Sequence, residues 1–145
     1  MTRVFLDTNF FIYLLEDCGE LSRKAQYLSQ CLAERRDQVV TSALTLGELL
    51  AKPLSLGDTD WASRYEQLFD TPGMNIVAFD RMCARHYARI RGDKSIKPPD
   101  AMQLACAIQG RCTLFITNDS RLSKKVVNGL DFILSLDQAA ALFQG

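Results

Sequence analysis

The sequence lacks the residues that several common enzyme mechanisms require. It has a single histidine, His86, so a nuclease that works with two histidines is excluded and a Ser-His-Asp triad would have to include this residue. His86 shares a predicted helix face with apolar residues, which favours a packing role. The glycine-rich patterns that bind nucleotides are absent, as is the G-x-S-x-G pattern of serine hydrolases. Carboxylates are the functional groups that remain.

Paired cysteines, excess charge and long apolar runs are also missing. The five cysteines are odd in number and no two have C-x-x-C spacing, so neither a zinc site nor a disulfide framework is indicated. Seventeen basic residues balance seventeen acidic ones, so any nucleic-acid site must be a local patch. No apolar run approaches the ~20 residues that cross a bilayer, and the beginning does not resemble a signal peptide. We expect a reduced, cytoplasmic protein with no membrane contact.

The residues that are present predict one α/β domain over residues 1–145. A chain of 145 residues, 48% of them hydrophobic, is long enough for one continuous core. Its short apolar runs do not alternate with polar residues, which indicates parallel strands covered on both faces. Helical patterns between them predict a three-layer α/β/α architecture. The runs are Val4–Leu6, Val39–Val40, Ile76–Phe79, Leu114–Ile116 and Phe132–Leu134. Helices are expected over 21–32, 44–50, 60–69, 81–90, 100–108 and 137–143, with loops at 52–58, 71–73 and 91–99.

An aspartate follows four of the five apolar runs. Ligands of an open α/β sheet bind beyond the carboxyl ends of its strands, so these aspartates are candidate functional groups. For any one of them the N-cap of a following helix is the favoured interpretation, because strand-to-helix turns prefer aspartate whatever the function. Spacing alone leaves both interpretations open for Asp7, Asp80, Asp119 and Asp137.

Two further acids have unusual neighbours. Glu48 lies in an otherwise apolar helical turn, Leu44–Leu50. It is either buried and paired with a cation, or at the helix rim with its carboxylate in water. Asp100 follows Lys97-Pro98-Pro99, and its Asp-x-x-Gln spacing to Gln103 looks like a capping box.

Four acids occur in order with recognisable neighbours. The segments are Phe5-Leu6-Asp7-Thr8-Asn9, Glu48-Leu49-Leu50, Pro99-Asp100-Ala101-Met102-Gln103-Leu104-Ala105 and Ile116-Thr117-Asn118-Asp119. This ordered set spans almost the whole chain and resembles the PIN-domain nucleases. The chain length is similar to that of the VapC-type toxins of toxin–antitoxin pairs. The resemblance implies a central parallel five-stranded sheet of order 3-2-1-4-5, with Asp7, Glu48, Asp100 and Asp119 converging at its carboxyl edge.

The resemblance also implies a chemistry and a set of partners. Carboxylates crowded into one cleft raise each other's pKa values unless a cation is present, and oxygen ligands without histidine or cysteine favour Mg²⁺ or Mn²⁺. The expected activity is endonucleolytic hydrolysis of RNA that leaves 5′-phosphate and 3′-hydroxyl ends. The expected partners are an antitoxin and a second copy of the chain.

Within this site the four acids and their neighbours have expected roles. Asp7 is the expected central ligand, Asp100 and Asp119 complete the site, and Glu48 acts directly or through water. Asn9 and Thr117 are expected to hold Asp7 and Asp119 by hydrogen bonds, although both residue types serve turns equally well. The implied strand order assigns Asp80 and Asp137, after outer strands, to N-caps.

Two basic patches are candidates for RNA binding. Arg81, Arg85 and Arg89 recur every four residues. Positions 81 to 97 contain six basic residues and a single acidic one, Asp93. Arg121 and Lys124, with Lys125, form a second patch beside Asp119. A solvated helix face would explain the first patch equally well.

Two other functions remain open. A phosphohydrolase with an aspartyl nucleophile would also place Asp7 after the first strand, but its usual D-x-D pattern fails at Asn9. A non-catalytic PIN-like interaction module is the second alternative, and the intact set of four acids argues against it.

Overall fold

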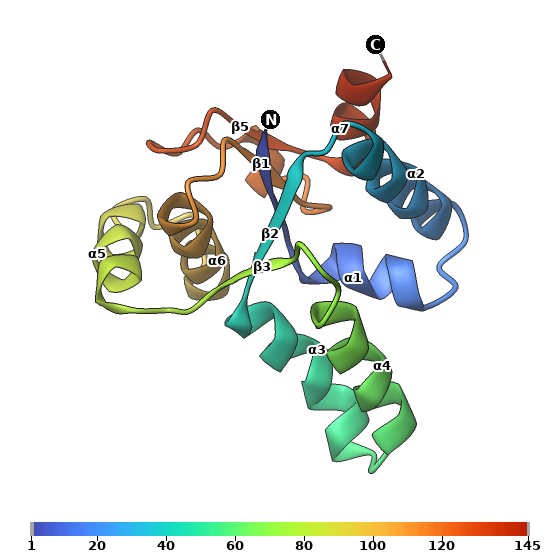
Figure 1. The fold of residues 1–145 in the computed structure, drawn as a ribbon. Coiled ribbons are helices and arrows are strands. Elements are labelled where there is room, and N and C mark those ends of the chain that lie inside the picture. The colour runs from blue at the N-terminus through green and yellow to red at the C-terminus, as the bar shows by residue number, and fades with distance from the viewer. Residues whose placement is uncertain (1, 145) are drawn as a thin grey trace.

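A parallel β-sheet forms the centre of the protein (Figure 1). The computed structural model describes residues 2–144. The five strands are β1 (Arg3–Leu6), β2 (Gln38–Ser42), β3 (Asn75–Val77), β4 (Leu114–Ile116) and β5 (Phe132–Leu134). Their order across the sheet is β3-β2-β1-β4-β5, and every neighbouring pair is parallel. The predicted order 3-2-1-4-5 is therefore confirmed.

Seven α-helices and one 3₁₀ turn complete the described chain. On one side of the sheet lie α1 (Thr8–Leu15), α2 (Glu20–Glu34) and α7 (Leu136–Phe143), and on the other lie α5 (Arg81–Ile90) and α6 (Pro98–Gln109). A helical pair, α3 (Ala43–Ser55) and α4 (Thr59–Phe69), extends beyond one edge of the sheet, and η1 (Leu122–Lys124) follows β4. No helix described between residues 2 and 144 combines the length and apolar character needed to cross a membrane.

The central strands are buried on both faces, as the unbroken apolar runs predict. Val4 and Leu6 of β1 point into the core shared with α1, α2 and α7, whereas Phe5 points into the core shared with α5 and α6. Phe5 stacks on Phe115 of β4 with ring centroids 5.1 Å apart. The three-layer arrangement is the direct consequence, because each face of the sheet needs its own cover.

Two expected loop boundaries are wrong. Helix α3 continues through Lys52 and the buried Pro53 to Ser55, where the proline predicted a loop from residue 52. Pro53 lies in the last turn, so its missing N–H removes a single backbone hydrogen bond while its ring gains burial. Helix α6 begins at Pro98, earlier than expected, because proline suits the first position of a helix.

The two aspartates assigned to N-caps behave differently. Asp80 caps α5, since its carboxylate accepts the amide N–H of Cys83 at 2.9 Å. The N-cap assignment of Asp137 is wrong. Ser135 caps α7 in a capping box with Gln138, and Asp137 lies in the first turn, where it forms a 2.7 Å ion pair with Lys24.

Candidate active site

The carboxyl edge of the two central strands places Asp7 at the middle of the molecule. Strands β1 and β4 pair with Leu6 opposite Ile116, so Asp7 and Thr117, the next residues, leave the sheet together. The amide of Asp7 still donates to the Ile116 carbonyl, at 3.4 Å. The sheet thus fixes the backbone from which the Asp7 side chain projects.

The Asp7 side chain does not act as a helix cap. Asp7 occupies the N-cap position of α1, yet no helix amide forms a capping hydrogen bond with its side chain. Its Oδ1 atom is buried and has no hydrogen-bond partner in residues 2–144. Burial raises the pKa of Asp7 to about 6, against the opposing effects of the Thr117 hydroxyl and the Phe10 amide. The charge of Asp100 raises this pKa further.

Asp100 and Asp119 face each other across a small cavity. Burial raises the pKa of Asp100, and the charges of Asp119 and Glu48 raise it further, while Lys97 and Arg121 act in the opposite direction. The cavity, of about 20 Å³, is lined by both acids together with Ile96, Lys97, Arg121 and Lys125. It therefore combines two carboxylates with three cationic side chains.

Asp119 also shapes the turn that follows β4. Its Oδ1 atom accepts the amide N–H groups of Arg121, at 2.9 Å, and Leu122, at 3.3 Å. Its own amide donates to the Thr117 hydroxyl at 3.1 Å. Turn formation thus engages one carboxylate oxygen of Asp119, and the capping and functional interpretations are compatible at this residue.

Glu48 reaches the site from α3 as an exposed side chain. Of the two placements considered for Glu48, the one at the helix rim is therefore correct. Its Oε1 atom accepts a hydrogen bond from the Thr8 hydroxyl at 2.9 Å and another from Nε2 of Gln103 at 2.8 Å. These donors come from α1 and α6, so three helices meet at this carboxylate.

The capping-box interpretation of Asp100 and Gln103 is wrong. Lys97 occupies the N-cap position of α6, and Asp100 is the third residue of the helix. Gln103 is 5% exposed and turns inward, where it bonds to Ser42, Thr45 and Glu48. The sequence signal for this burial was a glutamine amide whose neighbours along the helix, Ala101, Leu104 and Ala105, are all apolar.

The two expected supporting residues differ in what they contact. Thr117 is buried, accepts the Asp119 amide and lowers the pKa of Asp7. The side chain of Asn9 is exposed, and within residues 2–144 it has no hydrogen bond to Asp7 or Asp119. Only its backbone amide acts on Asp7, by lowering the pKa.

The four acids converge but do not chelate an ion as they stand. Within residues 2–144, no three His, Cys, Asp or Glu side chains are arranged closely enough to hold a metal. Electrostatic coupling nevertheless links Asp100 to Asp7, Asp119 and Glu48. Like charges near one another raise each other's pKa values, and a cation relieves this repulsion. The buried, unpartnered oxygen of Asp7 and the all-oxygen donor set fit a hard divalent cation.

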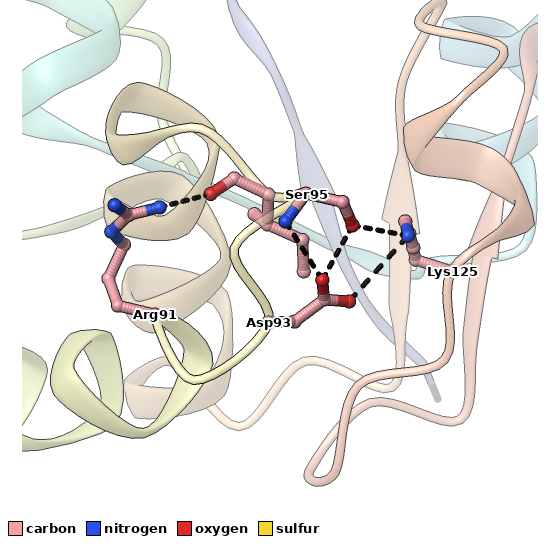
Figure 2. Close-up of polar contacts among 5 residues, drawn as sticks. Arg91, Asp93, Ser95 and Lys125 are labelled. Atoms are coloured by element: carbon pink, nitrogen blue, oxygen red, sulfur yellow. Dashed lines mark hydrogen bonds and ion pairs between the residues drawn. The ribbon is translucent and has the colours of Figure 1, made fainter.

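A polar cluster lies between the loop that precedes α6 and the segment that follows η1 (Figure 2). Lys125 bonds to the Ser95 hydroxyl and lies 3.6 Å from the Asp93 carboxylate. Asp93 in turn accepts the amide and the hydroxyl of Ser95. Arg91 donates to the Ile96 carbonyl on the other side of the same loop. The cluster ties the segment before α6 to the segment after η1.

The arginines of α5 lie at different distances from the acids. Helices α5 and α6 pack side by side, and Cys83 near the beginning of α5 lies against Cys106 near the end of α6. Arg89 lines a cavity together with Asp93, whose carboxylate lies 3.6 Å from Lys125 of the cavity that Asp100 and Asp119 line. Arg89 is therefore at the end of α5 that leads to Asp100, and Arg81 is at the other end. Arg81, Arg85 and Arg89 are all exposed, as is Lys124. Arg89 and the half-buried His86 line a separate cavity of about 410 Å³ beside Asp93.

Comparison with known proteins gives this architecture a family. The family model described as PIN domain matches residues 4–127. The chain therefore belongs to the PIN domain family, and the resemblance seen in the sequence is confirmed. No curated protein matches the chain in sequence at a significant level.

Several solved structures share the fold. A toxin–antitoxin complex from Klebsiella pneumoniae is 23% identical, with a TM-score of 0.66 over 88% of this chain and 94% of that one. DNA-bound VapBC from Salmonella typhimurium is 20% identical, with a TM-score of 0.71 over 94% and 99% of the two chains. VapC20 from Mycobacterium tuberculosis, described as a sarcin–ricin loop cleaving toxin, is 16% identical, with a TM-score of 0.63 over 85% and 96%. At these identities the likeness shows a common fold.

Proposed function

We propose that this chain is a divalent-metal-dependent endoribonuclease and the toxin member of a toxin–antitoxin pair. The observation that carries the proposal is the convergence of four acids at one sheet edge, around a buried Asp7 oxygen that has no partner in the described chain. The acids come from four separate segments: the end of β1, α3, α6 and the loop after β4. An arrangement that raises the pKa of Asp7 and Asp100 is unfavourable for the apo protein and favourable for a cation site.

The donor set indicates Mg²⁺ or Mn²⁺. Asp7, Asp100 and Asp119 would hold the ion, with Glu48 as a direct or water-mediated ligand. When bound, such an ion lowers the pKa of a water and neutralises charge on a phosphodiester. The side chains have separate tasks. The turn amides of Arg121 and Leu122 fix the Asp119 carboxylate, while the hydrogen bonds of Thr8 and Gln103 fix that of Glu48.

The cationic rim supports a phosphodiester substrate. Lys97, Arg121 and Lys125 line the cavity that also contains Asp100 and Asp119. A phosphate at this position would meet positive charge beside the acids, which is the local patch that a chain of zero net charge needs. The expected substrate is RNA, because VapC20 shares the fold and is described as cleaving the sarcin–ricin loop.

The expected partners follow from the structural neighbours. Several of them are toxin–antitoxin complexes, and an antitoxin is therefore the expected protein partner, together with a second copy of this chain. The cysteines Cys18, Cys31, Cys83, Cys106 and Cys112 are all free. Free thiols suit a reducing compartment, and the cytoplasm is the expected location.

Cleavage of RNA by the purified chain tests the proposal. Wild type should cut with Mg²⁺ or Mn²⁺ and should be inactive in excess EDTA. Asp100→Asn should abolish cleavage while leaving the unfolding temperature close to that of wild type. Asp80→Asn is the matched control, because Asp80 caps α5 outside the site and should leave cleavage intact. Cleavage in EDTA that Asp100→Asn reproduces would refute the metal mechanism. Wild type that cuts no RNA across a broad set, with metal present, would refute the nuclease.

A further inference from the structure

Gln103 is a buried amide on the apolar face of α6. It is 5% exposed, and its neighbours Ala101, Leu104 and Ala105 are fully buried. Burying an amide is unfavourable unless its donors and acceptor find partners. Gln103 lies three residues after Asp100, so both side chains leave α6 on the same side. Its placement therefore needs a reason connected with the site.

The hydrogen bonds of Gln103 fix the direction of its amide. The Ser42 hydroxyl accepts the amide of Thr45 at 3.2 Å, and its proton is donated to Oε1 of Gln103. Nε2 of Gln103 donates to the Thr45 hydroxyl at 2.9 Å and to Oε1 of Glu48 at 2.8 Å. A flipped amide would place its oxygen against the Glu48 carboxylate, which cannot donate when ionised. The NH₂ group must therefore face Glu48.

Glu48 is held at one oxygen and not at the other. Its Oε1 atom receives the Gln103 amide and the Thr8 hydroxyl, from two different helices. Within residues 2–144, no group donates a hydrogen bond to Oε2. An exposed glutamate without such donors would move among several rotamers. The two donors restrict that motion and leave Oε2 available.

We propose that Gln103 is a positioning residue that fixes Oε1 of Glu48 and so presents Oε2 to the divalent cation held with Asp100. The inference rests on the proposed function for the identity of that cation, and it adds a residue that touches neither the cation nor the RNA. Because Gln103 and Asp100 share α6, one helix sets the spacing between two carboxylates. Gln103 also anchors to Ser42, the N-cap of α3, which ties the helix carrying Glu48 to the helix carrying Asp100.

A double-mutant cycle on Mn²⁺ affinity separates positioning from general packing. The Kd of Mn²⁺ is measured by calorimetry for wild type, Gln103→Leu, Glu48→Gln and the double variant of the full chain. Loss of a residue that orients a ligand weakens metal binding by about tenfold or more. Gln103→Leu should show this loss in the wild-type background and no further loss when Glu48 is already replaced.

Thr45→Val is the matched packing control. It removes the second hydrogen bond donated by Nε2 of Gln103, together with the bonds of the Thr45 hydroxyl to Thr41 and Ser42, but leaves the bond to Glu48. It should lower the unfolding temperature, as Gln103→Leu does, while keeping the Mn²⁺ affinity within about twofold of wild type, because the orienting bond is intact. An equal loss of affinity in Thr45→Val would overturn the positioning role.

A wild-type measurement remains if Gln103→Leu does not fold. The side-chain NH₂ signal of Gln103, observed by NMR, should shift on addition of Mg²⁺ in wild type and stay unchanged in Glu48→Gln. An unchanged signal in wild type at saturating Mg²⁺ overturns the proposal.

The remaining outcomes are also decisive. If Gln103→Leu weakens Mn²⁺ binding equally in both backgrounds, or if Glu48→Gln leaves the affinity unaltered, Gln103 does not position a metal ligand. A coupled pair in a wild type that cuts no RNA would refute the nuclease and keep the positioning role. RNA cleavage by wild type without coupling between Gln103 and Glu48 would support the nuclease and refute the positioning role.

Discussion

Asp7 and Asp80 occupy the same sequence context and have opposite environments. Asp7 follows a buried apolar run and Asp80 a largely exposed one, and each stands at the N-cap position of a helix. The carboxylate of Asp80 accepts the Cys83 amide, which lowers its pKa, whereas burial raises the pKa of Asp7 to about 6. Strand β3, before Asp80, is at the edge of the sheet, and β1, before Asp7, is at its centre. The position of the strand thus goes with the environment of the aspartate that follows it.

The difference has an energetic meaning. Asp80 stabilises its helix by satisfying an amide that would otherwise lack a partner. Asp7 is held without a partner for Oδ1 and beside another acid, which destabilises the metal-free fold. Natural proteins accept such local losses of stability where function requires them. Four measurements test the roles assigned to these residues.

The largest expected effect is on cleavage. Asp7→Asn should reduce the rate of RNA hydrolysis by about a thousandfold, because metal-assisted stabilisation of developing charge is worth several kcal/mol. Asp80→Asn should leave the rate within about twofold of wild type. Single-turnover cleavage in Mn²⁺ measures both. Equal rates for the two variants would remove the distinction between the two aspartates.

The next effect is on the stability of the metal-free protein. Asp7→Asn removes a buried charge and should therefore increase the free energy of unfolding. The expected increase is on the order of 2 kcal/mol, less than the full pKa shift implies, because the site is partly exposed and solvent screens the charge. Asp80→Ala should lower the unfolding temperature by a few degrees through loss of the cap. Thermal unfolding in EDTA measures both shifts. An Asp7→Asn protein less stable than wild type would show that Asp7 stabilises the helix after all.

Stability should also depend on pH in a direction set by Asp7. Its pKa is raised from 3.8 to about 6 in the folded state, so the folded protein binds the proton more tightly. The stabilisation is complete below about pH 4 and is lost as the pH rises through about 6. The advantage of Asp7→Asn over wild type should therefore grow over this interval and level off above it. Urea unfolding at several pH values in EDTA measures the difference, and a difference independent of pH contradicts the raised pKa.

The smallest effect concerns the arginines of α5. Arg89 is at the end of α5 nearer Asp100 and Arg81 is at the remote end, so Arg89→Ala should weaken RNA binding more than Arg81→Ala. Each lost phosphate contact should reduce the slope of log affinity against log salt by about 0.7 for single-stranded RNA. Binding to the inactive Asp100→Asn protein is measured at several salt concentrations. If the slope of log affinity against log salt is the same with wild-type α5 and with both variants, this helix face does not contact RNA.

Much of this fold was predictable because the central strands carry unmistakable signals. The runs ending at Leu6 and Ile116 are uninterrupted and apolar, and both are buried at the centre of the sheet. The strand order came from the family resemblance, since a periodic pattern does not state which strands pair. The cap assignment of Asp80, which rested on the same implied strand order, is confirmed.

The details that were missed depend on contacts between distant residues. Gln103 has the spacing of a capping box, and only Ser42 and Thr45, 61 and 58 residues earlier, show that it turns inward. Aspartate is a residue type that often caps helices, but Ser135 lies two residues before Asp137 and is the N-cap of α7 in the structure. Local spacing cannot distinguish these alternatives, because the same side chains serve both.

On the proposed function Asp7, whose Oδ1 atom has no partner in residues 2–144, is a ligand for a divalent cation. The most direct test of this role is anomalous diffraction from crystals of the wild-type protein soaked in MnCl₂. We expect a Mn²⁺ peak within ~2.5 Å of an Asp7 carboxylate oxygen, the usual range for oxygen ligands, with Asp100 or Asp119 sharing the ion. The peak should be absent in Asp7→Asn crystals treated identically. A saturated crystal without density beside Asp7, or an ion that binds equally well in Asp7→Asn, would contradict the claim.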